Sequence, residues 1–414
     1  MRLLRNPVRR YAWGSRSAIA GIQGRPVPSP SPEAELWVGA HPADPSRVEP
    51  DGVPLTEVIA ADPARVLGPS VVAEFGPRLP YLLKLLAADT PLSLQAHPDP
   101  ARAAAGYAAE EAAGVPWDAP HRRYVDADHK PELLVAVSPF RALCGFRAPA
   151  ASAAALAGLA VARLEPVVAA LRRGELEAAV RALLSWPAPE RPVLVREVAT
   201  AAAAAGEHDY GMVGDLAGRY PDDVGVVVAL LLNDVRLEPG EAIFMPAGNL
   251  HAYLHGTGVE IMAASDNVLR GGLTPKHVDV PELLRVLRFH QLRDPVLRPV
   301  PVRPGVVTWP APVREFALHR VSVGADVPGA DLDLAGPVTV LCLAGRVRAD
   351  DGATAADLGP GQAGFGAAGS PVRITGEGVA YVASVGPTNP AGPGISPAGR
   401  APTRRPAPGS PRRG

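Results

Sequence analysis

The chain combines stretches with the hydrophobic pattern of strands and one stretch with the pattern of helices. Short apolar runs bounded by turn residues fill residues 1–148, and the run 79–87 is predicted to be a strand. Apolar residues recur at helical spacing over residues 150–220, where Gly174 and Pro187 separate helices of ordinary length. The pattern therefore predicts a mainly β protein with a helical insertion.

Strand-like runs resume after the helical stretch. The apolar runs 226–232, 242–245 and 259–263 are predicted to be strands, whereas residues 281–288 have the spacing of one more helix. After about residue 300 the chain again alternates between short strands and turns. A second β unit is therefore expected at the C-terminal end.

An internal repeat connects the two strand-rich parts. Residues 237–249 align with residues 358–370 at a constant offset of 121, and seven of the thirteen positions are identical. The Ala and Phe positions match as well as the Pro-Gly turn, so duplication of a β domain is favoured over chance recurrence of a turn. The expected organisation is a discontinuous β domain, a helical domain, a second β domain and a tail, at residues 1–148 with 223–299, 149–222, 300–387 and 388–414.

Composition and charge narrow the class of function. The chain has 41 basic and 42 acidic residues, and the net charge of −1 provides no field that would attract nucleic acid or an anionic membrane. No apolar stretch is long enough for a membrane span, and the start of the chain has no secretory pattern. Cys144 and Cys342 lie in separate apolar runs, as buried free thiols do. We therefore expect a cytoplasmic protein that binds neither nucleic acid nor membranes.

The basic residues are unevenly distributed. Residues 388–414 carry five arginines and no acidic residue in a Pro-, Gly- and Ser-rich segment, which predicts a disordered tail. Only three of the 41 basic residues are lysines, namely Lys84, Lys130 and Lys276. Arginine cannot replace a compact ammonium group that can lose its proton, so a specific role for these lysines is one interpretation. Chance retention of a few surface lysines is the other.

One spacing of glycine, proline and histidine indicates a metal ligand. Gly240, Pro246 and Gly248 precede His251 in a pattern that resembles the second metal-binding motif of the cupin superfamily, a group of small antiparallel barrels. His255 shares a strand face with His251 and is the weaker candidate. A packed core histidine is the alternative interpretation for each.

Further polar residues could complete a metal site. Gln95 and His97 share a strand face between packed leucines, where buried polar groups need a partner. With Glu132 and His251 they offer two nitrogen and two oxygen ligands, a set that suits Zn²⁺ as a Lewis acid, although Fe²⁺ or Mn²⁺ also fits. The position that corresponds to His251 in the repeat is Val372, so the C-terminal copy is expected to bind no metal.

A dense polar segment follows the predicted strand at residues 259–263. Glu260 interrupts an apolar stretch, so burial would raise its pKa, as a general base requires. Arg270 and Lys276 flank a Gly-Gly turn and could hold a phosphate or a developing oxyanion. A solvated loop with outward charges is the alternative.

Motifs spread over most of residues 1–290 resemble the class I mannose-6-phosphate isomerases, also called phosphomannose isomerases. They include Ser-Leu-Gln-Ala-His-Pro at 93–98 and His-Lys-Pro-Glu at 129–132, and they occur in the order of the family. The other matching stretches lie at residues 11–15, 34–42, 83–86, 239–242, 251–253, 265–267 and 274–276. After residue 300 the resemblance is weak and rests on the internal repeat.

The resemblance implies both a fold and a reaction. The fold would be two cupin-type antiparallel β-barrel domains of jelly-roll type plus a helical domain. The activity would be the zinc-dependent aldose–ketose isomerisation of mannose 6-phosphate and fructose 6-phosphate, with one Zn²⁺ per chain and a monomer as the default. The zinc ligands of the family fall on Gln95, His97, Glu132 and His251.

The resemblance also implies the remaining site residues. Arg270 would stabilise the negative cis-enediolate, and Lys130 or Glu260 would carry the proton between C1 and C2. His129 and Asp266 would assist ring opening. The other substrate-binding positions fall on Trp13, Ser93, Lys84, Tyr253 and Lys276.

Two other functions use similar residues. One is a metal-dependent cupin oxygenase with Fe²⁺, and the glutamine in the ligand set argues against it. The other is a catalytically inactive cupin that binds a sugar phosphate, and the presence of Lys130, Glu260 and Arg270 argues against that. The sequence leaves open whether an isomerase would serve mannose breakdown or the supply of GDP-mannose.

Overall fold

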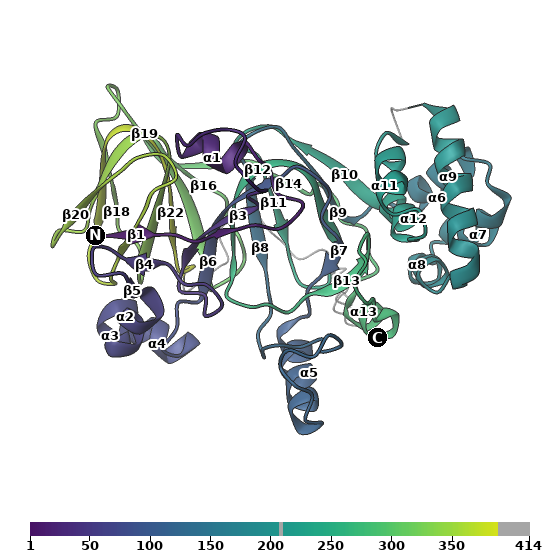
Figure 1. Cartoon of the computed structure of the whole chain (residues 1–414), viewed down its shortest axis with the longest axis horizontal. Helices are drawn as coiled ribbons and strands as arrows, with labels where there is room; N and C mark the ends of the chain where they lie inside the picture. The colour runs from purple at the N-terminus through teal and green to yellow at the C-terminus, as the bar shows by residue number, and fades with distance from the viewer. Residues whose placement is uncertain (207–209, 388–414) are drawn as a thin grey trace, which may run out of the picture.

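Two antiparallel sheets form the body of the protein (Figure 1). The computed structural model describes residues 1–206 and 210–387, and within these ranges each sheet has eleven strands. The tail expected at 388–414 lies outside the described residues. The mainly β architecture with a helical insertion, predicted from the hydrophobic pattern, is confirmed.

The first sheet has a long central strand that contacts both halves of the unit. Strand β12 pairs with β6 and β8 along its C-terminal part and with β7 and β9 at its start. The strands are β2 (Val8–Arg9), β3 (Glu35–Gly39), β6 (Tyr81–Ala88), β7 (Leu94–Ala96), β8 (Glu132–Ala136), β9 (Phe140–Phe146), β10 (Leu232–Leu237), β11 (Ala242–Met245), β12 (His251–Ala263), β13 (Leu269–Gly272) and β14 (Val296–Leu297).

The second sheet is built mainly from the C-terminal part of the chain but also takes three strands from its beginning. We expected all of residues 1–148 to belong to the first β domain, and these three strands lie elsewhere. Strand β1 pairs with β21 and thereby satisfies the backbone groups along the free edge of β21. The strands are β1 (Arg2–Arg5), β4 (Arg47–Val48), β5 (Val53–Pro54), β15 (Val300–Arg303), β16 (Val306–Thr308), β17 (Ala317–Val323), β18 (Gly329–Leu332), β19 (Val338–Asp350), β20 (Ala355–Leu358), β21 (Ala363–Gly366) and β22 (Val372–Ser384).

The internal repeat of the sequence corresponds to repeated strands. Strands β11 and β21 begin and end 121 residues apart, and so do the thirteen-residue strands β12 and β22. In each unit the shorter strand precedes the long one, which pairs with the strands at the centre of its sheet. The two sheets are therefore copies of one arrangement.

The helical insertion packs beside the first sheet, at the right of Figure 1. Its elements are α6 (Pro149–Gly158), η1 (Ala162–Leu164), α7 (Glu165–Arg172), α8 (Leu176–Leu184), η2 (Ala188–Glu190), α9 (Arg191–Ala205), α11 (Val213–Arg219), α12 (Gly225–Val228) and η3 (Ala229–Leu231). The prediction of a strand at 226–232 is wrong, because this run forms α12 and η3 before β10 begins. Residues 226–232 are completely buried, and a short apolar run buried on all sides fits either a helix or a strand.

Several helices interrupt the strand-like residues 1–148. They are α1 (Ala18–Ile22), α2 (Leu55–Ala61), α3 (Pro63–Leu67), α4 (Pro69–Phe75) and α5 (Pro100–Ala112), and α13 (Val280–Val286) follows later, close to the helix predicted at 281–288. Helices α3 and α5 begin at a proline preceded by an aspartate, and Asp62 and Asp99 accept hydrogen bonds from the backbone at Arg65 and Arg102. None of the described helices has the length and apolarity that a membrane span requires.

Candidate active site

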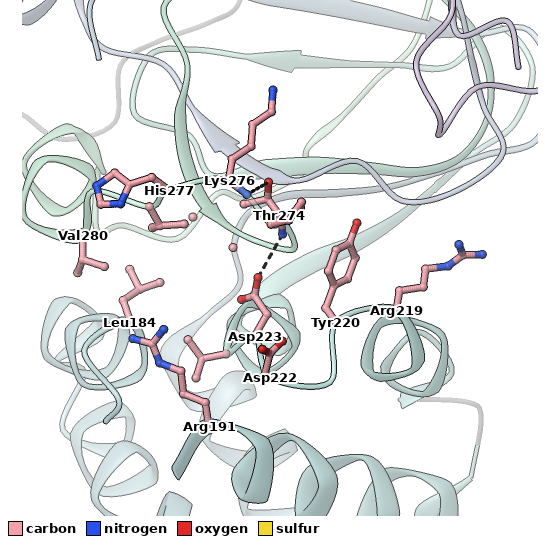
Figure 2. A pocket seen from close by; sticks show the side chains of 15 residues that line it. Leu184, Arg191, Arg219, Tyr220, Asp222, Asp223, Thr274, Lys276, His277 and Val280 are labelled. Atoms are coloured by element: carbon pink, nitrogen blue, oxygen red, sulfur yellow. Dashed lines mark hydrogen bonds between the residues drawn. The ribbon is translucent and has the colours of Figure 1, made fainter. Parts of the chain in front are cut away.

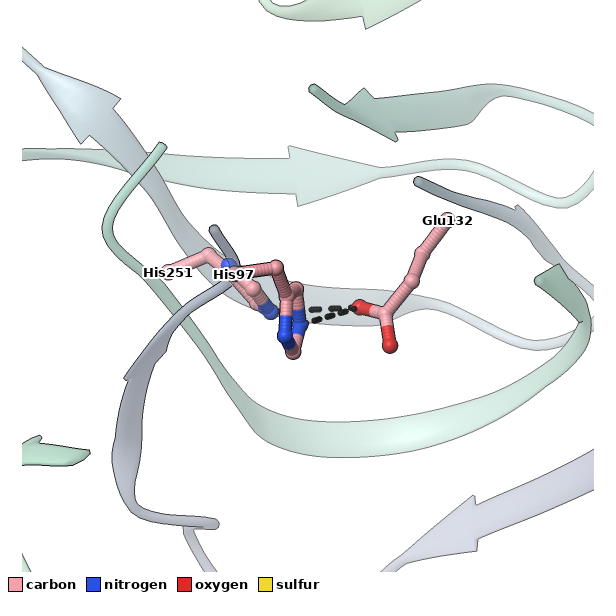
Figure 3. Close-up of side chains that lie close together, drawn as sticks. All are labelled: His97, Glu132 and His251. Carbon is pink, nitrogen blue, oxygen red and sulfur yellow. Dashed lines mark ion pairs between the residues drawn. The ribbon is translucent and has the colours of Figure 1, made fainter. Parts of the chain in front are cut away.

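Three buried side chains from separate strands converge in the first sheet (Figure 3). His97 follows β7, Glu132 begins β8 and His251 begins β12. The Oε2 atom of Glu132 lies 3.3 Å from Nε2 of His97 and 3.2 Å from Nε2 of His251. Their ligating atoms all lie within 4.8 Å of one another, which makes the group suitable for a metal ion.

The two imidazole rings are oriented by backbone carbonyls. We assign a proton to each Nδ1, since Nδ1 of His97 lies 2.8 Å from the carbonyl oxygen of Asn267 and Nδ1 of His251 lies 3.0 Å from that of Asn249. Each Nε2 then directs a lone pair toward Glu132. Burial lowers the pKa of His97, so this ring is neutral at physiological pH.

The geometry of the group fits a bound cation. Nε2 of His97 is buried and has no hydrogen-bond partner among the described residues. Burial alone would raise the pKa of Glu132, but the positive charge of Lys130 opposes it, and the pKa lies well below its ordinary value. Without a cation, the Nε2 lone pairs would repel the Glu132 carboxylate at these distances. The N–O distance of about 3.3 Å is about the separation expected between two ligands of a tetrahedral zinc ion with bonds near 2.0–2.1 Å.

Gln95 lies beside the three-residue group, and His255 does not. Gln95 is opposite His251 in the pairing of β7 with β12, and its Nε2 donates to Oγ of Ser93 at 3.3 Å, so its amide oxygen is free to act as a ligand. His255 is exposed, because the register of β12 shifts between Tyr253 and His255 and turns the later side chain outward. The expectation that His255 could share the face of His251 is therefore wrong.

The metal group opens into a cavity of about 760 Å³. Most residues that the sequence placed in the site line this cavity together with Gln95, Glu132 and His251. They are Trp13, Lys84, Ser93, Lys130, Tyr253, Glu260, Asp266, Arg270 and Lys276. The three lysines of the chain are all among them, which favours a specific role for these lysines over chance retention.

A buried network surrounds Glu260. Tyr253 donates its hydroxyl hydrogen to Oε1 of Glu260 at 2.7 Å, and Nζ of Lys84 lies 3.2 Å from Oε2. Lys84 also lies 3.3 Å from Oε1 of Glu35. Burial raises the pKa of Glu260 against the opposing charge of Lys84, as the sequence predicted. Burial alone would lower the pKa of Lys84, but the two carboxylates outweigh it and raise it, so Lys84 stays charged.

The other charged residues of the cavity differ in their partners. Nζ of Lys130 lies 3.1 Å from Oε1 of Glu132, so it contacts the metal group directly. Asp266 is tied to the buried His41, whose Nε2 lies 3.3 Å from its carboxylate. Arg270 lies opposite Gln95 on β13, and burial lowers its pKa. A proton acceptor, a metal group and unpaired cations are thus present in one cavity.

His129 is the one predicted site residue that the structure places elsewhere. Its ring lies beside Glu315 in the C-terminal part of the chain, with Nε2 2.5 Å from Oε1, and it does not line the cavity. Neighbouring residues in an extended segment point to opposite sides, so Lys130 and His129 cannot both face the cavity. The expectation that His129 assists ring opening conflicts with this placement.

Sequence reasoning missed several residues of the cavity. Glu35 and Trp37 line it from β3, and a charged residue that interrupts an apolar run, as at Glu260, was the signal for Glu35. Arg219 and Tyr220 line the cavity from the helical insertion. Arg122 and Arg123 line it from the segment after α5. No local pattern marks these last residues, because they reach the cavity only through the packing of separate units.

Comparisons with known proteins give one consistent result. Residues 1–149 match the model of the type I phosphomannose isomerase catalytic domain. The mannose-6-phosphate isomerase of Escherichia coli (strain K12) is 38% identical over 392 residues, which cover 91% of this chain and 98% of that protein. The mannose-6-phosphate isomerase of Schizosaccharomyces pombe is 31% identical, with 90% and 96% covered.

Solved structures agree with these relatives. A crystal structure of zinc-bound mannose 6-phosphate isomerase is similar with a TM-score of 0.83 and 34% identity, over 93% of this chain and 99% of that one. A phosphomannose isomerase variant from Salmonella typhimurium gives a TM-score of 0.84 with the same identity and coverage. The resemblance inferred from the sequence motifs is confirmed, and the chain belongs to the type I phosphomannose isomerase family.

Proposed function

We propose that the protein is a zinc-dependent mannose-6-phosphate isomerase that interconverts mannose 6-phosphate and fructose 6-phosphate. The observation that carries this proposal is the buried His97–Glu132–His251 group, with an unpartnered imidazole nitrogen, in the same cavity as the buried Glu260. The curated relatives named above carry this activity in their names, and a similar solved structure has zinc bound. A cupin oxygenase or an inactive sugar-phosphate-binding cupin has no comparable support.

Four side chains would hold the zinc ion. His97 and His251 offer Nε2, and Glu132 and Gln95 offer oxygen atoms. When bound, zinc supplies Lewis-acid polarisation of substrate oxygens. Cys144 and Cys342 remain buried free thiols, and burial raises the pKa of Cys144 to about 12, so neither competes as a ligand.

Glu260 is the proposed proton carrier between C1 and C2. It lines the cavity, and its raised pKa brings a carboxylate closer to the range in which it can both accept and return a proton. Tyr253 and Lys84 each hold one of its oxygens and fix its orientation. Lys130 is the second candidate, because it contacts Glu132 and lines the same cavity.

The remaining cavity residues would bind and orient the sugar phosphate. Arg270 stands next to the metal group and would stabilise negative charge that develops on the substrate, because it has no ion-pair partner among the described residues. Asp266, held by His41, would assist ring opening. Lys276 and Ser93 would contact the phosphate, and Trp13 would contact the sugar.

A coupled assay of mannose 6-phosphate turnover with zinc-loaded protein tests the proposal. The expected result is turnover that depends on zinc, and no turnover in zinc-replete protein would contradict it. Exchange of solvent tritium at C2 then separates the two proton carriers. Glu260→Gln should lower exchange by about a hundredfold or more, whereas the surface variant Glu238→Gln should not change it. If Lys130→Gln abolishes exchange and Glu260→Gln retains it, Lys130 is the carrier instead.

We further propose that the enzyme acts as a monomer in the cytoplasm, where the reaction serves mannose breakdown or the supply of GDP-mannose. The buried free thiols are compatible with a reducing compartment. Light scattering of the purified protein checks the oligomeric state, and a stable dimer would contradict the monomer.

A further inference from the structure

The charged side chains that line the substrate cavity are of two kinds: some have ion-pair partners among the described residues and others do not. Seven basic side chains and four carboxylates line it. Lys84 and Lys130 pair with carboxylates at the metal end. Arg122 and Arg123 pair with carboxylates behind the cavity wall. The metal end therefore carries little excess positive charge from the protein itself.

Three basic residues of the cavity have no such partner. Arg219, Arg270 and Lys276 form no ion pair within the part of the chain that the structure describes. Arg270 lies on β13, Lys276 lies in the loop that follows β13, and Arg219 is the last residue of α11 in the helical insertion. Arg270 lies beside the metal group, opposite Gln95, whereas the uncompensated charges of Lys276 and Arg219 favour a dianion such as a phosphate monoester.

A backbone contact fixes the helical insertion against the loop that carries Lys276. Oδ1 of Asp223 accepts a hydrogen bond from the amide of Gly225 at 2.7 Å, and its Oδ2 accepts one from the amide of Thr274 at 3.2 Å. A Cβ atom at Gly272 would lie 2.8 Å from Cα of Gly225, so the two segments meet backbone to backbone. Since α11 ends four residues before Asp223, this contact contributes to the position of Arg219.

The same loop also lines a second cavity of about 720 Å³ (Figure 2). Arg219, Tyr220 and Lys276 line both cavities, whereas Arg191 lines the second one and not the first. Figure 2 shows Arg219 and Tyr220 on one side of Asp223 and Arg191 on the other. Nε of Arg191 donates to the carbonyl oxygen of Trp186, so Arg191 is a matched arginine of the insertion that does not reach the substrate cavity.

We infer that Arg219 is a phosphate-binding residue, so that the helical insertion supplies a second cation to the phosphate site of Lys276. The inference rests on the proposed function for the identity of the substrate. The insertion would thereby determine specificity for phosphorylated over unphosphorylated sugars. Tyr220 lies between Arg219 and Asp223 in sequence, lines the same cavity and would pack against the bound ligand.

Substitution of Arg219 tests the inference. Arg219→Gln should raise the KM for mannose 6-phosphate and the inhibition constant of inorganic phosphate about tenfold each, and it should affect KM more than kcat. Arg219→Lys keeps the positive charge, so it should raise the KM and the inhibition constant less than Arg219→Gln does. Arg191→Gln should leave both constants within about twofold. All assays are run at constant ionic strength, because phosphate contacts weaken with salt.

Direct binding of inorganic phosphate to zinc-loaded protein, measured by calorimetry, separates this inference from the proposed function. Weaker binding to the Arg219→Gln variant and unchanged binding to the Arg191→Gln variant support the inference even if the wild-type protein does not isomerise mannose 6-phosphate. Equal phosphate binding by the wild-type protein and the Arg219→Gln variant overturns it even if the wild-type protein is active. A fall in kcat with no change in phosphate binding also overturns it.

Discussion

The two β units of the protein share one strand arrangement but have interiors of different chemistry. In the first unit β12 pairs with β6, β7, β8 and β9, and in the second β22 pairs with β17, β18 and β19. The pairing registers match the two units position by position. The metal-group positions Gln95, His97, Glu132 and His251 correspond in this way to Leu332, Leu334, Val338 and Val372.

The corresponding positions of the second unit belong to a packed apolar cluster. Leu332, Val338 and Val372 are buried in it, and Leu334 packs against it. The first unit has a carboxylate and two histidines at the same places, a buried group that could hold a cation. The comparison teaches that the scaffold alone does not specify a metal site. At these four positions the first unit has possible metal ligands, whereas the second has residues of a packed apolar cluster.

The largest effect is expected when a residue of the second unit is placed in the first. Glu132→Val should abolish zinc binding and lower turnover about a thousandfold or more, because the cation loses its only anionic ligand. The reciprocal Val338→Glu change should leave the zinc content at one per chain but destabilise the fold by about 3 kcal/mol, since it buries an unpaired carboxyl group. Elemental analysis and denaturant unfolding measure the two effects. Full zinc content and turnover in Glu132→Val would contradict the comparison.

The next largest effect concerns lysine in the first unit. Lys84→Arg should lower kcat about a hundredfold, because a planar guanidinium cannot replace the ammonium group between Glu35 and Glu260 in a buried site. On the second sheet, Arg373 forms an exposed ion pair with Asp331. The opposite exchange there, Arg373→Lys, should change the free energy of unfolding by less than about 0.5 kcal/mol. Steady-state kinetics and denaturant unfolding test the contrast. Wild-type kcat in Lys84→Arg would show that charge alone suffices there.

The next prediction concerns the pH dependence of zinc binding by His97 in the first unit. A ligating histidine must be neutral, and burial lowers the pKa of His97, so this ligand stays available below its ordinary pKa near 6.5. Zinc content should therefore remain at one per chain as the pH falls from 7.5 to about 6 and decrease only at lower pH. Dialysis at each pH followed by elemental analysis measures this. Loss of half of the zinc above pH 6.5 would contradict the expectation.

The smallest effect is expected at His319 in the second unit. Burial lowers the pKa of His319 to about 4, and its Nδ1 has no hydrogen-bond partner among the described residues. The unfolded chain takes up this proton near pH 6.5, so stability is full above that pH and is lost as the pH falls toward 4.

A variant that cannot titrate isolates this contribution. Between pH 7 and pH 4.5 the free energy of unfolding should fall by about 1–2 kcal/mol less in His319→Gln than in the wild-type protein. The zinc content should not change. Urea unfolding at the two pH values measures it. Equal losses in the two proteins would show that His319 does not contribute to acid sensitivity.

The sequence predicted the features that depend on local pattern. The strand at 242–245, the repeat offset of 121 and the metal group were all readable, because strand parity and turn residues place His251 and Glu132 on fixed faces. The apolar run 226–232 was misassigned, since complete burial removes the periodicity that separates a helix from a strand.

Features that depend on contacts between distant segments were not readable. The pairing of β1 with β21, the position of His129 beside Glu315 and the approach of Arg219 to the cavity all arise from packing between units. Nothing in the local sequence distinguishes Arg219 from the other arginines of the insertion. Its place in the cavity follows from the packing of the helical insertion against the first sheet, which includes the contact between Asp223 and Thr274.

Titration of metal-free protein with zinc, followed by the coupled assay with mannose 6-phosphate, tests the central claim most directly. If the first unit alone forms the site, turnover should rise linearly and reach its maximum at one zinc ion per chain, and the Glu132→Val variant should show no rise. Full turnover in metal-free protein, or a maximum at two ions per chain, would contradict the claim that one metal site in the first unit performs the reaction.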